Sequence, residues 1–221
     1  MESGSPRIHF GNSVSATNKW WVQELRANDA EDGAGTVVNS AVSITLDLSV
    51  AATKVWLEKA VIGLNLCPFA KAVHLQKKIR WVVSTATTEE ALRADLVQEL
   101  TDLSAVDPAE VETTLLIHPY VLADFLDYNA FLTIANQALR QLRLEGILQI
   151  ASFHPNYQFA ESSKDDPANF SNQSPFPTLH LLRESSIEAA VAAYGDPALI
   201  YQNNIDTLRR LGPAGWRQLW V

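Results

Sequence analysis

The sequence predicts an α/β fold: a single domain over residues 49–221, with a mixed, mostly parallel sheet of at least four strands and helices packed on it. Two observations lead to this prediction. Short apolar segments of strand length alternate along the chain with helical patterns that carry capping residues. In addition, 47% of the residues are hydrophobic, which is enough to bury a core without metals or disulfides.

Residues 1–48 are expected to form a peripheral or partly disordered N-terminal extension. Most of this segment is rich in Ser, Asn, Gly and Asp and shows little periodicity. Near its end, Val42, Ile44, Leu46 and Leu48 alternate with polar residues, and this pattern predicts a half-buried strand.

A helical pattern begins at Ser49 and places Leu57 and Val61 on one face. Pro68 is expected to end this helix, because a residue that precedes proline is displaced from the helical region. The segments that follow are rich in aliphatic residues and bounded by turn or capping signals. The predicted strands are Lys78–Thr85, Thr113–Ile117, Ile147–Phe153 and Thr178–Arg183.

The helices between and after these strands have recognisable ends. Thr87 and Glu90 match a capping box for a helix with leucines at helical spacing. A helix over Asp124–Leu144 is expected to stop at Gly146. The last two helices are predicted over Ser185–Gly195 and Asp196–Pro213.

Charge and cysteine content exclude several classes of function. The formal net charge of −8 argues against nucleic-acid binding, which usually needs a strongly basic surface. Cys67 is the only cysteine, so an internal disulfide is excluded and a reducing compartment is indicated. No apolar stretch approaches the roughly 20 residues of a membrane helix, and no secretory signal is recognisable. We therefore expect a cytoplasmic protein that binds neither nucleic acid nor membrane; the sequence leaves the oligomeric state open.

Two histidines close predicted strands: His118 follows the second strand and His154 follows the third. Strands joined by a helix within one sheet are normally parallel, so these two strand ends should meet on one edge. Ligands of open α/β sheets bind outside that edge. A proline follows each histidine and stiffens the local backbone. We expect His118 and His154 to line one cleft, which His180 joins only if its strand face turns towards it.

The polar loop Pro155–Pro177 leaves from the same point. Loops of this length in a compact domain are usually lids, binding loops or disordered segments, so this one is either the wall of a binding site or a solvated connector. The candidate ligand-binding residues for a small polar molecule are Asn156, Tyr157, Gln158, Asn172 and Arg183.

Three stretches also carry a family resemblance: "GLNLCPFA" (63–70), "ASFHPNYQFA" (151–160) and "SPFPTLHLLRE" (174–184). Together they resemble the bacterial domain of unknown function 1415 family, over roughly residues 54–220. The resemblance implies no activity, cofactor or catalytic residue, so the chemistry has to be inferred from the residues themselves.

Three interpretations of these residues stay open. The favoured one is a small-molecule enzyme in which His118 and His154 act in acid–base chemistry or hold a divalent metal, with Asp165 or Asp166 as a carboxylate ligand. In the second, Cys67 is a nucleophile; its place at the C-terminal end of a helix opposes this role, because the helix dipole there disfavours a thiolate. The third is a non-catalytic ligand- or protein-binding module.

Overall fold

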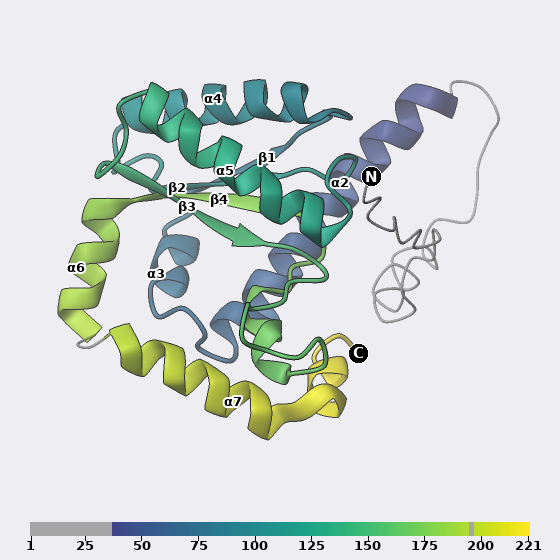
Figure 1. The fold of residues 1–221 in the computed structure, drawn as a ribbon, viewed down its shortest axis with the longest axis vertical. Coiled ribbons are helices and arrows are strands. Elements are labelled where there is room, and N and C mark those ends of the chain that lie inside the picture. Colours follow the sequence, from purple (N-terminus) through teal and green to yellow (C-terminus); the bar gives the residue numbers. More distant parts are fainter. Residues whose placement is uncertain (1–36, 195–196) are drawn as a thin grey trace, which may run out of the picture. The chain divides into compact units, whose positions relative to one another are not determined.

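The computed structural model describes residues 37–194 and 197–221, and its centre is a four-stranded sheet in the order β1-β2-β4-β3 (Figure 1). The four strands coincide with the four predicted ones to within two residues at each end. Their bounds are β1 (Ile79–Val83), β2 (Thr113–Ile117), β3 (Leu148–Phe153) and β4 (Thr178–Arg183).

The sheet is mixed, and the expectation that it would be mostly parallel is wrong. β1 and β2 are parallel, whereas β4 is antiparallel to both of its neighbours, β2 and β3. The chain passes from β3 to β4 through a loop whose only helix is the short 3₁₀ helix η3 (Pro167–Asn172). Without a crossover helix the strand runs back beside β3, and Thr178 pairs with Phe153. β2 and β3 still run in the same direction, because each is antiparallel to β4.

Helices α4 (Glu89–Ala105) and α5 (Phe125–Gln141) cover one face of this sheet (Figure 1). Four leucines of α4 at helical spacing have no exposed surface, as predicted, and they pack in one cluster with leucines of β2, β3 and β4. Burying one leucine side chain contributes roughly 1.5–3 kcal/mol, so this cluster is a main source of stability. Its members from α4 are Leu92, Leu96, Leu100 and Leu103.

The opposite face of the sheet is covered less completely. Helix α2 (Val37–Trp56), the π-helix η2 (Leu57–Ile62) and helix α7 (Pro197–Gln218) form a second apolar cluster, which packs against Trp81 and Phe153. Both of these strand side chains remain half-buried. The shorter helices α3 (Ala70–Leu75) and α6 (Glu184–Tyr194) complete the described elements.

The strand predicted over Val42–Leu48 is wrong, because these residues belong to α2. The helix that begins in the pattern at Ser49 extends backwards through them, since each added residue gains a helical hydrogen bond. A strand here would also need a neighbour to pair with. The helix spans the predicted boundary between residues 48 and 49, and the part of the predicted extension before residue 37 lies outside the described residues.

Several predicted helix ends are displaced. Thr88, not Thr87, caps α4, and its hydroxyl accepts from the Ala91 N–H. Asp124 caps α5 as expected for a helix start, but Arg143 rather than Gly146 takes the first left-handed conformation after this helix, with a φ of 57°. The left-handed residue that ends the helix therefore lies earlier in the chain than predicted, because an exposed Arg adopts this conformation at modest cost.

The remaining helix ends differ for similar local reasons. Helical structure from α2 ends with η2 at Ile62, before Pro68 is reached. In α7, Gly212 has a φ of 64° and kinks the helix, which continues to Gln218. The predicted stop at Gly195 and start at Asp196 lie outside the described residues.

Candidate functional site

His118 and His154 both pack against the ring of Tyr128, a residue of α5. The His118 ring stacks on Tyr128 with a centroid distance of 5.7 Å, and the His154 ring lies 5.1 Å from the same phenol. All three side chains have 0% exposed surface. The structure therefore brings the two histidines together, but in a closed polar cluster that consists of His118, Tyr128 and His154.

The backbone holds both imidazoles in a defined tautomer. His118 Nδ1 lies 3.1 Å from the carbonyl oxygen of Val121, and His154 Nε2 lies 3.2 Å from that of Leu122, so both nitrogens donate. His154 Nδ1 then accepts from the N–H of Asn156 at 3.0 Å. The fourth ring nitrogen, His118 Nε2, is buried and has no hydrogen-bond partner among the residues that the structure describes.

The hydroxyl of Tyr128 connects the ends of two strands. It donates to the carbonyl oxygen of Thr178 at 2.9 Å and accepts from the N–H of Phe153 at 3.1 Å. These two backbone groups stand opposite each other in the β3–β4 pairing, so the phenol is inserted into the end of the ladder. It satisfies both groups at a point where water is excluded.

Burial determines the protonation states in the closed polar cluster. It lowers the pKa of His118 and of His154 to about 4, and it raises the pKa of the Tyr128 phenol. For His118, the neighbouring His154 adds to the lowering, because two positive charges at this spacing repel each other. At neutral pH the cluster is therefore uncharged.

His180 lies on the opposite face of the sheet. Its Nε2 is 2.7 Å from the hydroxyl oxygen of Thr113, which itself donates to the carbonyl oxygen of Leu181. Its half-buried ring lies 6.1 Å from the ring of Phe153, and burial lowers its pKa to about 4. The β-strand alternation of side chains separates His180 from His118 and His154.

In the described residues, Asp165 and Asp166 do not join the two histidines in a metal site. Over residues 37–194 and 197–221, no three His, Cys, Asp or Glu side chains are arranged to hold a metal ion. Asp165 is exposed, while Asp166 caps η3 and forms an ion pair with Arg209 at 2.8 Å. This ion pair lowers the pKa of the Asp166 carboxyl.

Cys67 lies just after the turn that follows η2, and it packs against the second apolar cluster. Burial raises the pKa of its thiol, which is the opposite of what an activated nucleophile needs. Its role as a nucleophile stays a hypothesis.

The predicted ligand-binding residues of the loop Pro155–Pro177 make their contacts mainly with other residues of the chain. Tyr157 packs between Phe125 and Phe159, with ring distances of 5.2 and 5.1 Å. The side chain of Gln158 donates to the carbonyl of Ser162 within the loop. Asn156 is exposed and supplies the N–H that His154 accepts.

Asn172 fastens the loop to the outer edge of β3. The side-chain N–H of Asn172 donates to the backbone carbonyl oxygen of Ser152 at 3.1 Å. The backbone carbonyl oxygen of Asn172 accepts from the N–H of His154. These bonds cover the last two backbone positions of that edge.

Arg183 is buried with 8% exposed surface and faces α4 rather than solvent. Its guanidinium donates to the carbonyl oxygens of Leu103, Val106 and Val111. A cation at the C-terminal end of α4 is favourable, because the last carbonyls of a helix carry partial negative charge. The Arg183 side chain therefore links β4 to the C-terminal end of α4.

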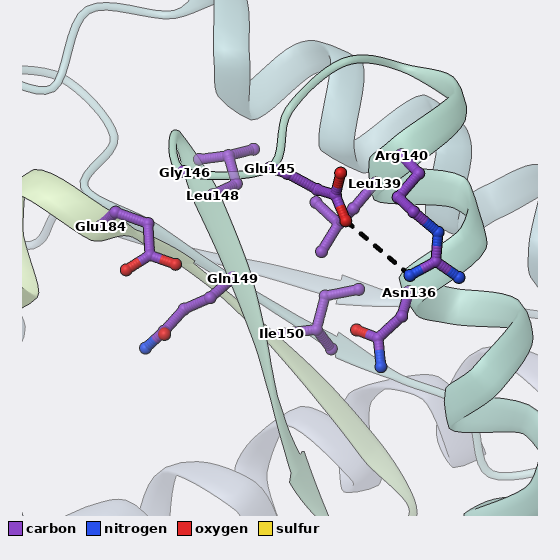
Figure 2. A pocket seen from close by; sticks show the side chains of 9 residues that line it. All are labelled: Asn136, Leu139, Arg140, Glu145, Gly146, Leu148, Gln149, Ile150 and Glu184. Atoms are coloured by element: carbon purple, nitrogen blue, oxygen red, sulfur yellow. Dashed lines mark ion pairs between the residues drawn. The ribbon is translucent and has the colours of Figure 1, made fainter.

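An open groove lies elsewhere, between the start of β3 and the C-terminal part of α5 (Figure 2). It has a volume of about 320 Å³, and Figure 2 shows Gln149 and Glu184 on one side of β3 and Asn136 and Arg140 on the other. Arg140 forms an ion pair with Glu145 across the groove at 3.7 Å. We call this site the β3 groove; its lining residues are Asn136, Leu139, Arg140, Glu145, Gly146, Leu148, Gln149, Ile150 and Glu184.

The sequence-based prediction missed the β3 groove, because the strand order was needed to place β3 at the edge of the sheet. A signal was present in Gln149 and Ser152, two polar residues within an otherwise apolar strand, which is typical of a strand with an exposed side.

Comparison with known proteins identifies the family. Residues 49–218 match the model of a family described as a protein of unknown function (DUF1415). The chain belongs to the DUF1415 family. No curated protein and no solved structure matches it.

The DUF1415 region contains all four strands, the closed polar cluster and the β3 groove. Its bounds agree with the resemblance that the three sequence stretches indicated. Among the helices in the described residues, none has the length and hydrophobicity that crossing a membrane requires.

Proposed function

We propose that this DUF1415 protein is a non-catalytic binding module and that the β3 groove is its ligand site. The main supporting observation is the contrast in accessibility. His118 and His154 have no exposed surface, while the β3 groove opens to solvent and is lined by charged, amide and aliphatic side chains. Concave sites with a few polar groups on an apolar base are the usual form of ligand-binding sites.

The state of the histidines supports the same proposal. Three of the four ring nitrogens of His118 and His154 already bind backbone groups of the protein. A general acid or base has to reach its substrate within hydrogen-bond distance, and its pKa is best placed near the working pH. Both imidazoles have a pKa of about 4, far below the neutral range.

The second candidate function is the histidine-centred enzyme that the sequence favoured. One observation supports it: His118 Nε2 is an unprotonated nitrogen without a partner in residues 37–194 and 197–221, and such a lone pair is a base. For this nitrogen to act on a substrate, the loop and α5 would have to separate and expose it.

An NMR screen of the full chain distinguishes the two functions. The probes are small carboxylates, amines, sugars and dipeptides, and divalent metal ions are titrated separately. We expect chemical-shift changes at Asn136, Gln149 and Ile150, while the imidazole resonances of His118 and His154 stay unchanged. Shift changes confined to those imidazoles, or an imidazole that titrates near pH 7, would contradict the binding-module proposal and support the enzyme.

A further inference from the structure

The outer edge of β3 has backbone groups that no other strand uses. Among the described strands, β3 lies at the end of the sheet and pairs with β4 alone. In an antiparallel ladder, alternate residues direct their N–H and C=O groups to opposite sides. Glu184 N–H binds the carbonyl of Ile147, so the odd-numbered positions of this segment face β4.

The even-numbered positions face outwards, and the two ends of this edge are already occupied. Leu148 N–H donates to the carbonyl of Leu144, and Asn172 binds the carbonyl of Ser152 and the N–H of His154. Between these points, Ile150 N–H and C=O, Leu148 C=O and Ser152 N–H have no partner in the part of the chain that the structure describes.

These free groups border the β3 groove, because Leu148 and Ile150 line it. An edge strand with free N–H and C=O groups is a template for an additional strand. The occupied ends restrict what can bind: Leu144 and Asn172 stand where a long partner strand would continue. A complete fifth strand from a second copy of the chain would meet them, whereas a short extended segment fits between them.

The charges around the groove specify the partner further. Arg140 and Glu145 form an ion pair with each other, and their side chains are 51% and 62% exposed. A charged group of a ligand can therefore replace either partner at little cost. The half-buried Glu184 has no ion pair within the described residues. Together with the net charge of −8, this leaves the groove with an excess of one carboxylate and favours a cationic partner.

We propose that the β3 groove binds a short, extended, basic peptide segment of a partner protein by strand addition. The middle residue of the segment exchanges two backbone hydrogen bonds with Ile150. The side chains before and after it project to the face that carries Gln149 and Glu184, where Lys or Arg reaches a carboxylate. This inference rests on the proposed binding function and specifies the ligand class of the same site.

The test uses the full chain and a fluorescent, end-blocked probe peptide with the sequence Gly-Ser-Lys-Val-Lys-Ser-Gly. We expect saturable binding, with the largest amide shifts and slowed hydrogen exchange at Ile150 and Ser152. Replacing both lysines by Glu should weaken binding about fivefold, as expected for exposed ion pairs. Methylating the central Val nitrogen removes one backbone bond and should weaken binding about tenfold.

Two pairs of protein variants assign the effect to the groove. Glu184→Gln should weaken the lysine peptide about threefold and should not weaken the glutamate peptide, because a like-charge repulsion is removed. Ser152→Pro removes an outward N–H and should weaken both peptides, whereas Ser152→Ala retains that group and serves as its control.

Each of the other outcomes has a defined meaning. Equal binding of the lysine and glutamate peptides, or insensitivity to Val methylation, overturns the strand-addition proposal. Protection of Ile150 that depends only on protein concentration indicates a second copy as the occupant and also overturns it. If small molecules shift the groove resonances and peptides do not, this inference fails while the binding-module proposal stands; if only the histidine resonances respond, both fail.

Discussion

The closed polar cluster and the β3 groove both lie beside α5, but they differ in what satisfies their hydrogen-bonding groups. In the cluster, backbone carbonyls and N–H groups bind His118, Tyr128 and His154, and no side chain is exposed. Along the groove, the N–H and C=O of Ile150 have no partner among the described residues. Buried polar groups need internal partners because losing one costs about 1–3 kcal/mol, whereas groups that face solvent can exchange water for a ligand. Burial therefore separates polar residues that hold the fold from those available for binding.

Acidification is expected to have the largest effect, and it acts on the closed polar cluster. His118 and His154 have a pKa of about 4 in the folded protein, compared with 6.5 in an unfolded chain. The unfolded state therefore binds protons first as the pH falls below 6.5. The contribution of these two histidines to the free energy of unfolding is fully present above pH 6.5. It decreases between pH 6.5 and pH 4 and does not decrease further below pH 4. At pH 5 the loss is about 2 kcal/mol for each histidine, or about 4 kcal/mol for the pair.

Urea unfolding at pH 7 and pH 5 measures this loss. The variant His118→Phe keeps a ring stacked on Tyr128 but cannot be protonated. It should be less stable than the natural chain at pH 7, because the Val121 carbonyl loses its hydrogen-bond donor. Its loss of stability between pH 7 and pH 5 should be smaller by about 2 kcal/mol, because His154 and His180 still take up protons. An equal free energy of unfolding at the two pH values would show that the histidines are not enclosed.

Removal of the Tyr128 hydroxyl is expected to have the next largest effect. Tyr128→Phe leaves the Phe153 N–H and the Thr178 carbonyl without their shared partner, and we expect a loss of about 3 kcal/mol. Tyr157→Phe is the matched control: that hydroxyl is half-buried and makes one 3.5 Å contact with Ser152, so its loss should cost less than about 0.5 kcal/mol. Denaturant unfolding of both variants gives the two losses in free energy of unfolding. Similar losses would contradict the claim that enclosed polar groups stabilise the fold more than exposed ones.

A smaller effect is expected for Cys67. Because burial raises the pKa of its thiol, we expect iodoacetamide to alkylate the folded protein at least about tenfold more slowly at pH 7 than it alkylates the chain in urea. Mass spectrometry of the modified fraction over time gives both rates. Faster reaction in the folded protein, or fast reaction at pH 6, would restore the nucleophile interpretation.

The fold was largely predictable because its strands and helices have strong local patterns. The leucines of α4 and the segment Thr178–Arg183 specify their elements without tertiary information. The order of strands was not predictable in this way. The position of β4 between β2 and β3 depends on the path of the loop Pro155–Pro177. The hydrophobic periodicity of the sequence does not predict that path.

The site was predicted less well than the fold, for a related reason. Strand direction predicts that His118 and His154 meet at one edge, but it does not predict that both rings are buried there against Tyr128. Arg183 was a candidate ligand residue by type and position, yet its side chain faces the end of α4. The sequence gives residue type and approximate position, whereas function depends on which groups remain accessible.

The smallest effect on stability is expected in the β3 groove, and this is the sharpest test of the comparison. Asn136 is exposed, Gln149 is half-buried, and neither side chain has a hydrogen-bond partner within the described residues. Asn136→Ala should raise stability by a few tenths of a kcal/mol, because Ala has the higher helix propensity, while Gln149→Ala should lower it slightly in a strand, at roughly the same size. The double variant should thus unfold within about 0.5 kcal/mol of the natural chain. A loss of stability above about 1 kcal/mol would mean that the groove, like the closed polar cluster, holds the fold together, because exposed side chains away from such networks rarely cost that much.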